Sequence, residues 1–282
     1  MRILIALTST RNNYETLRFS AQLAQRTEIP PTILMMVARE TDRFLSPAEK
    51  SLKDAREQMD IPELITKIRT GDPIKEIILE VEEGKHDLVI IGEKYTSYWV
   101  RWFHRFPAVC VAEQVPCSAI ISKGKAKPIR RILLCDSGAG SSSVLSRYTA
   151  QLAKILPNEE HVTVLHVMSQ ISAGPGVSGK YLRASTEELI EENTLEGQIL
   201  ERDVQTLEHL GIHPIPKVRH GLVVNEILTE AQNGDYDLVV VGQHLPSGPQ
   251  SFLLDNIAHQ IMKRIDRPIL VVRGDEITDP TQ

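Results

Sequence analysis

The residues best placed to do chemistry lie at the end of a valine-rich stretch in the last quarter of the chain. The stretch 237–241 (Asp-Leu-Val-Val-Val) ends on Gly242; a polar loop follows, then a helical pattern over 251–266 and a second apolar stretch at 268–273. This order predicts strand, loop, helix and strand of a parallel α/β sheet. A glycine at the carboxyl end of a buried strand, with a helix soon after, is typical of the edge where such sheets bind ligands, phosphates included.

Other patterns give little support for catalysis. The nine histidines include no H-E-x-x-H zinc motif, and the sequence has no G-x-S-x-G nucleophile elbow. His244 lies in the loop after Gly242 and is interpreted as a surface histidine, with contact to a ligand as the alternative. The small-residue turn 137–143 could bind an anion through backbone amides, but an ordinary helix cap explains it as well. We therefore expect no catalytic residue, no metal site and no enzyme.

Composition narrows the class of protein. A length of 282 residues suits two domains, and a net charge of −5 argues against nucleic acid as the partner. No apolar run approaches the ~18 residues of a membrane-spanning helix, so membrane insertion is not expected. The three cysteines form no C-x-x-C pair, which favours reduced thiols and a cytoplasmic location.

The chain is an internal repeat. Segment 71–92 aligns with 221–242 without a gap at an offset of 150, and nine of the 22 positions are identical. These are Gly71/Gly221, Glu76/Glu226, Ile77/Ile227, Glu80/Glu230, Gly84/Gly234, Asp87/Asp237, Leu88/Leu238, Val89/Val239 and Gly92/Gly242. A tandem duplication of one α/β unit is predicted, with domains at 1–125 and 128–275 and a polar tail at 276–282.

Each half shows the same alternation of strand and helix patterns. In the first half we expect strands at 2–7, 32–37, 65–69 and 87–91, and helices at 14–26, 46–59 and 73–84. In the second half we expect strands at 132–136, 162–167 and 214–219, and helices at 144–156, 186–210 and 225–233. Ser46 and Pro47 are interpreted as the start of their helix. The acidic residues of 186–210 are interpreted as a solvated face.

An aromatic segment follows the first copy of the repeat. Trp99, Trp102, Phe103 and Phe106 recur at i, i+3, i+4 and i+7, and Tyr95 and Tyr98 lie beside them. This spacing predicts one apolar helix stripe. Packing against the sheet or the other half explains it; a surface for a partner or ligand is the alternative.

Each half resembles a universal stress protein domain. The resemblance is carried by 131–136, by Leu165-His166-Val167, by Gly221 and by the block 237–273. It implies two tandem Rossmann-like (adenine-nucleotide α-hydrolase-like) domains, each with a five-stranded parallel sheet flanked by helices. The family is usually dimeric, so the tandem form implies an intramolecular pseudo-dimer in which strands 118–122 and 269–273 pair.

The resemblance also implies a nucleotide site. Many family members bind ATP through a motif in which Gly-x-x-Gly is followed by nine residues and then by Gly-Ser or Gly-Thr. In this sequence Gly242 occupies the first glycine position of that motif. Leu245 occupies the second glycine position, and Asp255-Asn256 occupy the final Gly-Ser/Thr positions. The Asp255 carboxylate would repel a polyphosphate, whereas Asn256 could donate a hydrogen bond.

Two further positions fit the family pattern better. Asp136 matches the acidic residue near the base and ribose, and Val167 matches the valine that faces adenine. The expected nucleotide-binding residues are therefore Asp136, Val167, Gly242 and Asn256, with an ordinary helix N-cap as the alternative role for Asp136. The first half has Thr8 in place of Asp136 and no later Gly-Ser, so it is not expected to bind ATP.

These features favour a regulatory stress-response protein with a degenerate adenine-nucleotide crevice in its second domain. No obligate cofactor is expected; ATP, ADP or AMP would bind weakly. One alternative is a ligand-free scaffold that contacts an unknown protein partner through 95–106; another is a slow ATPase. Association of the chain into a homodimer is left open.

Overall fold

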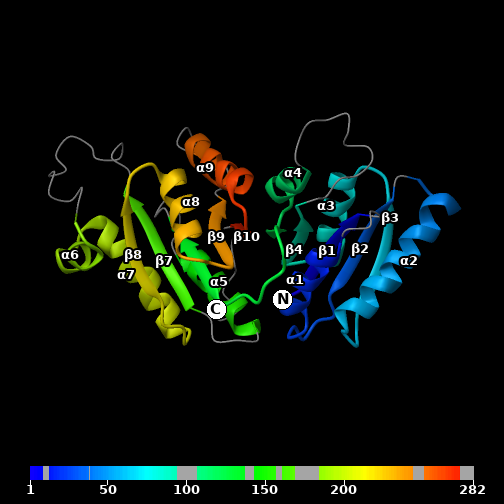
Figure 1. The fold of residues 1–282 in the computed structure, drawn as a ribbon, viewed down its shortest axis with the longest axis horizontal. Coiled ribbons are helices and arrows are strands. Elements are labelled where there is room, and N and C mark those ends of the chain that lie inside the picture. The colour runs from blue at the N-terminus through cyan, green and yellow to red at the C-terminus, as the bar shows by residue number, and fades with distance from the viewer. Residues whose placement is uncertain are drawn as a thin grey trace. The chain divides into compact units, whose positions relative to one another are not determined.

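The computed structural model describes residues 1–8, 13–37, 39–93, 107–136, 143–156, 161–168, 184–243 and 251–273, excepting the side chains of residues 8, 107, 143 and 251–256. The chain divides into two units (Figure 1). The first comprises Met1–Pro128, Ile155–Pro157 and Asp266–Val271; the second comprises Ile129–Lys154, Asn158–Ile265 and Val272–Gln282. Within the described ranges, no helix combines the length and the apolar character that crossing a membrane requires.

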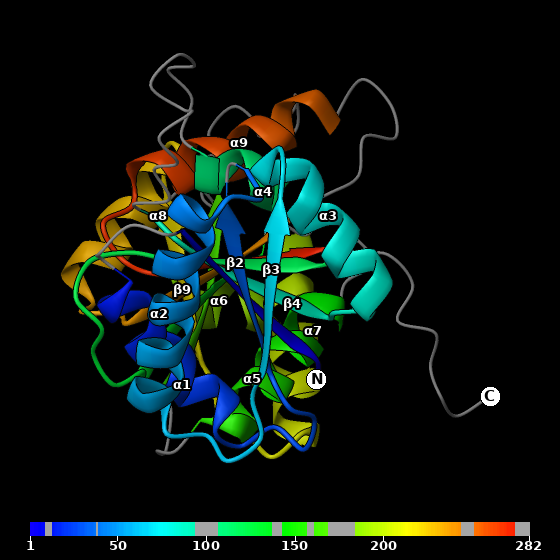
Figure 2. The ribbon, with the colours of Figure 1, turned by 90° about the vertical axis from the view of Figure 1, so that its right-hand side faces the viewer.

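The first unit is built on a parallel sheet in the order β3-β2-β1-β4-β5. Its strands are β1 (Ile3–Thr8), β2 (Thr32–Val37), β3 (Ile65–Thr70), β4 (Leu88–Gly92) and β5 (Ser118–Ser122). Its helices are α1 (Tyr14–Ala24), α2 (Asp42–Met59), α3 (Pro73–Gly84) and α4 (Pro107–Gln114). Figure 2 shows α1 and α2 on one face of the sheet and α3 and α4 on the other, so the central strands are buried on both faces.

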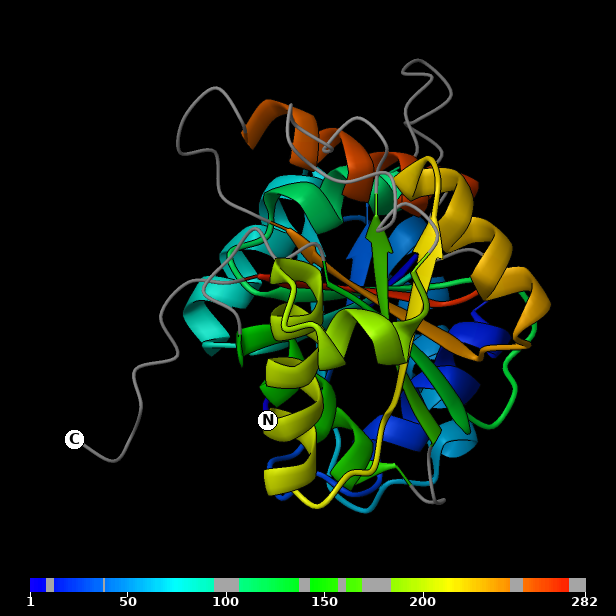
Figure 3. The ribbon, with the colours of Figure 1, turned by 90° about the vertical axis from the view of Figure 1, so that its left-hand side faces the viewer.

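In the second unit the strands β8-β7-β6-β9 repeat the order β3-β2-β1-β4 of the first unit, again with parallel pairing. Its strands are β6 (Arg131–Cys135), β7 (His161–Met168), β8 (Ile215–His220) and β9 (Leu238–Gln243). Its helices are α5 (Ser143–Ile155), α6 (Thr186–Glu191), α7 (Leu195–His209), α8 (Val223–Asn233) and α9 (Ser251–Arg264). Figure 3 shows α7 and α8 on opposite sides of β7 and β8. The predicted Rossmann-like α/β fold is confirmed.

The last strand, β10 (Ile269–Arg273), pairs antiparallel with β5. Ile269, Leu270 and Val271 lie opposite Ile121, Ile120 and Ala119. The predicted pairing of 118–122 with 269–273 is therefore confirmed; the pseudo-twofold axis inferred with it stays a prediction.

Two predicted helix boundaries are wrong. Helix α2 begins at Asp42, one turn before the predicted Ser46, because the amides of Phe44 and Leu45 bond to the Thr41 carbonyl and start the helix there. Pro47 then lies inside the helix. The single helix predicted over 186–210 is two helices, because Asn193 adopts a left-handed φ of 51° and the Thr194 side chain caps the Gly197 amide to begin α7.

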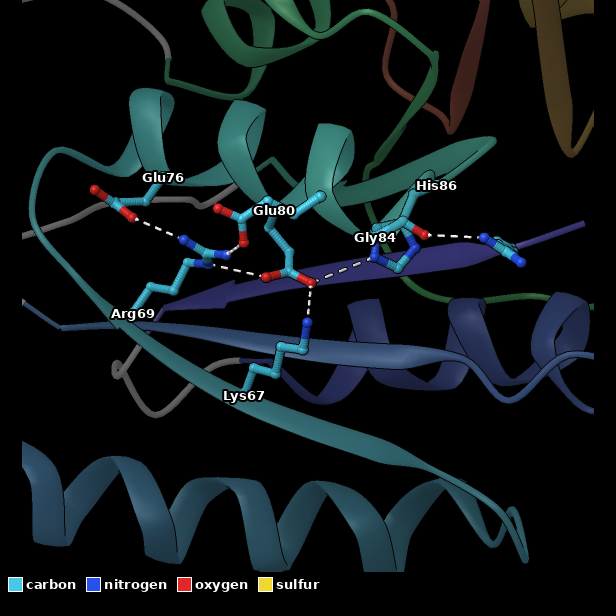
Figure 4. A network of polar contacts seen from close by, with 8 residues as sticks. Lys67, Arg69, Glu76, Glu80, Gly84 and His86 are labelled. Carbon is cyan, nitrogen blue, oxygen red and sulfur yellow. Dashed lines mark hydrogen bonds and ion pairs between the residues drawn. The ribbon is translucent and has the colours of Figure 1, made fainter.

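A buried ion-pair network joins α3 to β3 (Figure 4). The Glu80 carboxylate is fully buried and accepts hydrogen bonds from Lys67 Nζ at 2.6 Å and Arg69 Nε at 2.9 Å. Arg69 also contacts Glu76 and Glu83. Because both Glu80 oxygens are engaged by cations, the pKa of this carboxyl lies below its ordinary value although burial alone would raise it.

The same network recurs between α8 and β8 at an offset of 150. Glu230 is engaged by Lys217 Nζ at 2.8 Å and by Arg219 Nη1 at 3.0 Å, and Arg219 Nε also bonds Glu226 at 2.7 Å. The identities Glu76/Glu226 and Glu80/Glu230 thus preserve a helix-to-strand clamp. The basic partners lie just before the aligned segment, so an alignment that reached back to residue 65 would have identified them.

One member of the network differs between the units. In the second unit the Tyr236 hydroxyl donates to Glu230 Oε1 at 3.0 Å. In the first unit the equivalent residue is His86, whose Nε2 lies 3.5 Å from Glu80 Oε1. Both rings lie over a glycine: a Cβ at Gly84 would come within 2.3 Å of the His86 ring, and one at Gly234 within 2.1 Å of the Tyr236 ring. This close approach requires the duplicated glycine.

Candidate functional site

Three of the four predicted nucleotide-binding residues lie at the carboxyl ends of neighbouring strands. Asp136 follows β6, and its amide donates to the Leu165 carbonyl of β7 at 3.2 Å. Val167 lies near the end of β7 and Gly242 near the end of β9, where Cys135 pairs with Val241. We call this group the strand-end site. The side chains of Asn256 and Asp255, and residues His244 and Leu245, lie outside the described residues, as do the 137–142 turn and the aromatic segment 95–106.

The Asp136 carboxylate is held by a cation from the same unit. Arg202 of α7 donates from Nη2 to Asp136 Oδ2 at 2.7 Å. The same nitrogen lies 3.4 Å from Asp203 Oδ1. The Asp136 side chain is only 10% exposed and that of Arg202 is 31% exposed, so the guanidinium reaches inward to a nearly buried carboxylate. Charge-assisted bonds of this length are among the stronger hydrogen bonds in proteins.

Asp203 extends the cluster into the core. Its side chain is fully buried, and Oδ1 accepts a hydrogen bond from Ser146 Oγ of α5 at 2.9 Å. The other oxygen, Oδ2, has no regular hydrogen-bond partner among the described residues. Burial first, and then repulsion by the neighbouring Asp136 carboxylate, raises the pKa of Asp203 to about 8. The protonated form of Asp203 is therefore favoured, and Arg202 remains the ion-pair partner of Asp136.

His166 completes the polar lining beside Asp136. Its Nδ1 lies 3.1 Å from the Asp136 carbonyl oxygen, which can only accept, so Nδ1 carries the proton of the neutral ring. Burial lowers the pKa of His166, which favours this neutral form. Neutral forms of Asp203 and His166 are therefore favoured, and the ion pair of the cluster is the contact between Asp136 and Arg202.

Arg202, Asp203 and Ser146 were not among the residues predicted from the sequence. The interpretation of the acidic residues of 186–210 as a solvated face is wrong for Asp203. A signal was present: Leu200 and Leu207 are buried, and Asp203 stands at i+3 from Leu200, on the same apolar stripe of α7. A carboxylate on an apolar stripe indicates a buried polar contact.

Gly242 has a packing role that does not depend on a ligand. A Cβ at Gly242 would lie 2.9 Å from Leu145 Cδ1 of α5. At the equivalent Gly92, a Cβ would lie 2.5 Å from Thr16 Oγ1 of α1. Both glycines therefore allow a helix side chain to approach the end of the strand, which explains their identity in the repeat.

The described residues contain no group of three or more His, Cys, Asp or Glu side chains that could hold a metal ion. His209 and His213 are spaced by four residues, as in zinc-binding helices. However, α7 ends at His209, whose Nδ1 lies 2.6 Å from the Gln205 carbonyl oxygen, so a shared helical face does not continue to His213.

The model of the universal stress protein family matches residues 128–273, slightly more than half of the chain. The chain belongs to the universal stress protein family. Asp136, Val167 and Gly242 all lie within the matched range, as do Arg202 and Asp203.

Solved structures extend the shared fold over nearly the whole chain. A universal stress protein from Archaeoglobus fulgidus DSM 4304 has a TM-score of 0.65 at 14% identity, over 98% of this chain and 97% of that protein. A protein of unknown function from Pseudomonas aeruginosa PAO1 has a TM-score of 0.69 at 15% identity, over 97% of this chain and 92% of that one. Identities this low show the fold alone. None of the curated proteins matches the chain.

Proposed function

We propose that this universal stress protein is a regulatory stress-response protein that binds an adenine nucleotide weakly at the strand-end site of its second unit. The observation that carries the proposal is the meeting of Asp136, Val167 and Gly242 at the ends of β6, β7 and β9. The carboxyl edge of a parallel sheet is where such folds bind ligands. The family resemblance implies that the ligand is ATP, ADP or AMP.

Weak binding follows from the residues that the site offers. Asp136 already has Arg202 as a partner, so a ligand hydroxyl must compete with an existing ion pair. The sequence places Leu245 and Asp255 where the family pattern has glycines that approach phosphate. A ligand in this site therefore keeps contacts to its base and ribose and lacks part of the phosphate cradle.

We further propose that the protein acts without catalysis, in the cytoplasm, as an intramolecular pseudo-dimer. The three cysteines, Cys110, Cys117 and Cys135, include no C-x-x-C pair, and this spacing favours reduced thiols and a reducing compartment. Asp203 is fully buried and engaged with Ser146, which does not suit it to act as an acid on a bound substrate. Incubation with ATP should therefore release no ADP above the background of an Asp136→Asn variant.

Isothermal titration with ATP, ADP and AMP tests the proposal. We expect dissociation constants weaker than about 1 μM, corresponding to less than ~8.2 kcal/mol of binding free energy. Submicromolar ATP binding would contradict a degenerate site, and no binding at millimolar nucleotide would contradict any nucleotide role.

Hydrogen exchange locates the ligand, with the repeat as an internal control. Saturating AMP should slow exchange of the amides around Asp136 and Gly242. It should leave the equivalent strand ends of the first unit, at Thr8 and Gly92, unchanged. Equal protection at both strand ends would mean that the first unit binds as well.

A further inference from the structure

The strand-end site contains a cation that the family pattern does not account for. Arg202 bonds the Asp136 carboxylate at 2.7 Å, from a helix that lies 66 residues further along the chain. Neither the glycine pattern nor the strand-end aspartate requires a basic residue there. The packing of the unit nevertheless positions the pair. Arg202 is adjacent to Asp203 on α7, and Asp203 accepts a hydrogen bond from Ser146 of α5.

Within the cluster, Arg202 makes its shorter contact with Asp136, at 2.7 Å, against 3.4 Å to Asp203. A carboxylate that is 90% buried is costly unless it is paired. Asp203 lies 3.4 Å from the same Arg202 nitrogen and is fully buried. Burial and the neighbouring Asp136 carboxylate raise its pKa, which favours the protonated form. Burial lowers the pKa of His166 and favours its neutral form, and Glu196 lies near enough to act on His166 electrostatically. Within this cluster, Asp136 and Arg202 form the ion pair whose two charges cancel.

We propose that Arg202 determines which ligands the strand-end site accepts, because it cancels the Asp136 charge and so admits phosphorylated nucleosides that the bare carboxylate would repel. This inference rests on the proposed nucleotide binding. Arg202 acts through Asp136 and is therefore a positioning and specificity residue. The site with Arg202 accepts nucleoside and nucleotide alike, whereas the site without it favours the uncharged nucleoside.

The size of the effect follows from Coulomb's law. At an effective dielectric constant of about 30 and a separation of about 8 Å, one unit charge changes the affinity for a ligand charge of −1 by roughly tenfold. A phosphate monoester such as AMP carries about −1.5 to −2 at pH 7, so its affinity changes by roughly 30- to 100-fold. The preference for AMP over adenosine should therefore follow the net charge at positions 136 and 202. It should be highest for Asp136→Asn (+1), intermediate for wild type (0) and lowest for Arg202→Gln (−1).

The experiment measures dissociation constants of AMP and adenosine by isothermal titration for wild type and its variants. Arg202→Gln should lower the AMP-over-adenosine preference roughly 30- to 100-fold, and Asp136→Asn should raise it by a similar factor. The double variant should return close to the wild-type ratio. Arg202→Lys, which keeps the charge, should stay within about threefold of wild type. The control is Arg147→Gln, which removes the same charge from an exposed position of α5 and should leave the ratio unchanged.

The outcomes separate this inference from the proposed function. If both ligands bind and Arg202→Gln and Asp136→Asn leave the ratio unchanged, or shift it in the same direction, Arg202 does not set ligand charge. Should Arg202→Gln fail to fold, a fall or no change in the ratio for Asp136→Asn alone overturns the inference. Absence of binding of both AMP and adenosine to wild type refutes the nucleotide function, and the role of Arg202 falls with it.

Discussion

Replacing His86 by tyrosine would give the first unit the polar contact of the second. His86 is 9% exposed, and neither ring nitrogen has a regular hydrogen bond among the described residues. The equivalent Tyr236 donates to Glu230 at 3.0 Å. A hydrogen bond to a charged group contributes about 1.5–3 kcal/mol, and overpacking by the larger ring costs about 1–3 kcal/mol. Because the tyrosine ring is already accommodated over Gly234, we expect His86→Tyr to stabilise the protein by about 1 kcal/mol at pH 7.

The pH dependence gives the sharper test. Burial lowers the pKa of His86 below the ordinary 6.5, so the unfolded chain takes up the proton before the folded chain does. The contribution of neutral His86 to stability is therefore complete above pH 6.5 and is lost as the pH falls below it. His86→Tyr should remove this loss, so that its advantage over wild type grows between about pH 7 and pH 5.

Urea unfolding at several pH values, followed by circular dichroism, measures both effects. Tyr236→Phe is the matched control: it removes only the hydroxyl from the second unit, should destabilise the protein by about 1.5–3 kcal/mol, and should leave the acid sensitivity unchanged. If His86→Tyr and wild type lose stability in parallel on acidification, the assignment of the acid-sensitive group to His86 is wrong.

Two other substitutions test the buried polar groups and the repeat. Asp203→Asn should gain stability relative to wild type as the pH rises from about 4 to 8, because the unfolded chain ionises Asp203 in this window while burial favours the protonated form in the folded chain. The same difference in urea midpoint between variant and wild type at about pH 5 and at about pH 8 would contradict this. Gly84→Ala should lower the free energy of unfolding by about 1–3 kcal/mol, since its Cβ would lie 2.3 Å from the His86 ring. In thermal unfolding, the double variant with His86→Ala should recover part of that loss. Strictly additive effects of the two substitutions would argue against the clash.

The polar and glycine identities of the repeat have structural explanations in the described part of the chain. Gly71 and Gly221 adopt φ values of +138° and +148°, which few other residues accept. Asp87 and Asp237 each accept a hydrogen bond from the amide at or near the start of the first strand of their unit, Arg2 at 2.6 Å and Arg131 at 3.0 Å. With the glutamate clamp and the packed glycines, these residues maintain the fold. The alignment therefore predicted the duplicated architecture well and the ligand site less directly.

The strand and helix pattern followed from the sequence because it depends on local periodicity. Apolar stretches such as 32–37 and 88–92 are short and bounded by turn residues, so their identity as buried strands needs no distant information. The order of strands then places Asp136, Val167 and Gly242 at one edge, since parallel strands end on the same side. Local pattern was therefore sufficient to predict the strands, whereas Asp136 and Val167 were predicted from the family resemblance.

The sequence by itself determined the α/β class, the duplication and the residues at the strand ends. Only the tertiary structure decided what Asp136 contacts, because Arg202 lies 66 residues from Asp136 and Ser146 lies 57 residues from Asp203. Such partners depend on how α5 and α7 pack onto the sheet, and packing also supplies the burial that keeps the proton on Asp203. Residue spacing predicted Gly242 at a ligand-binding edge, and the family resemblance added Asp136 and Val167; the tertiary structure determined the charged partners of the site.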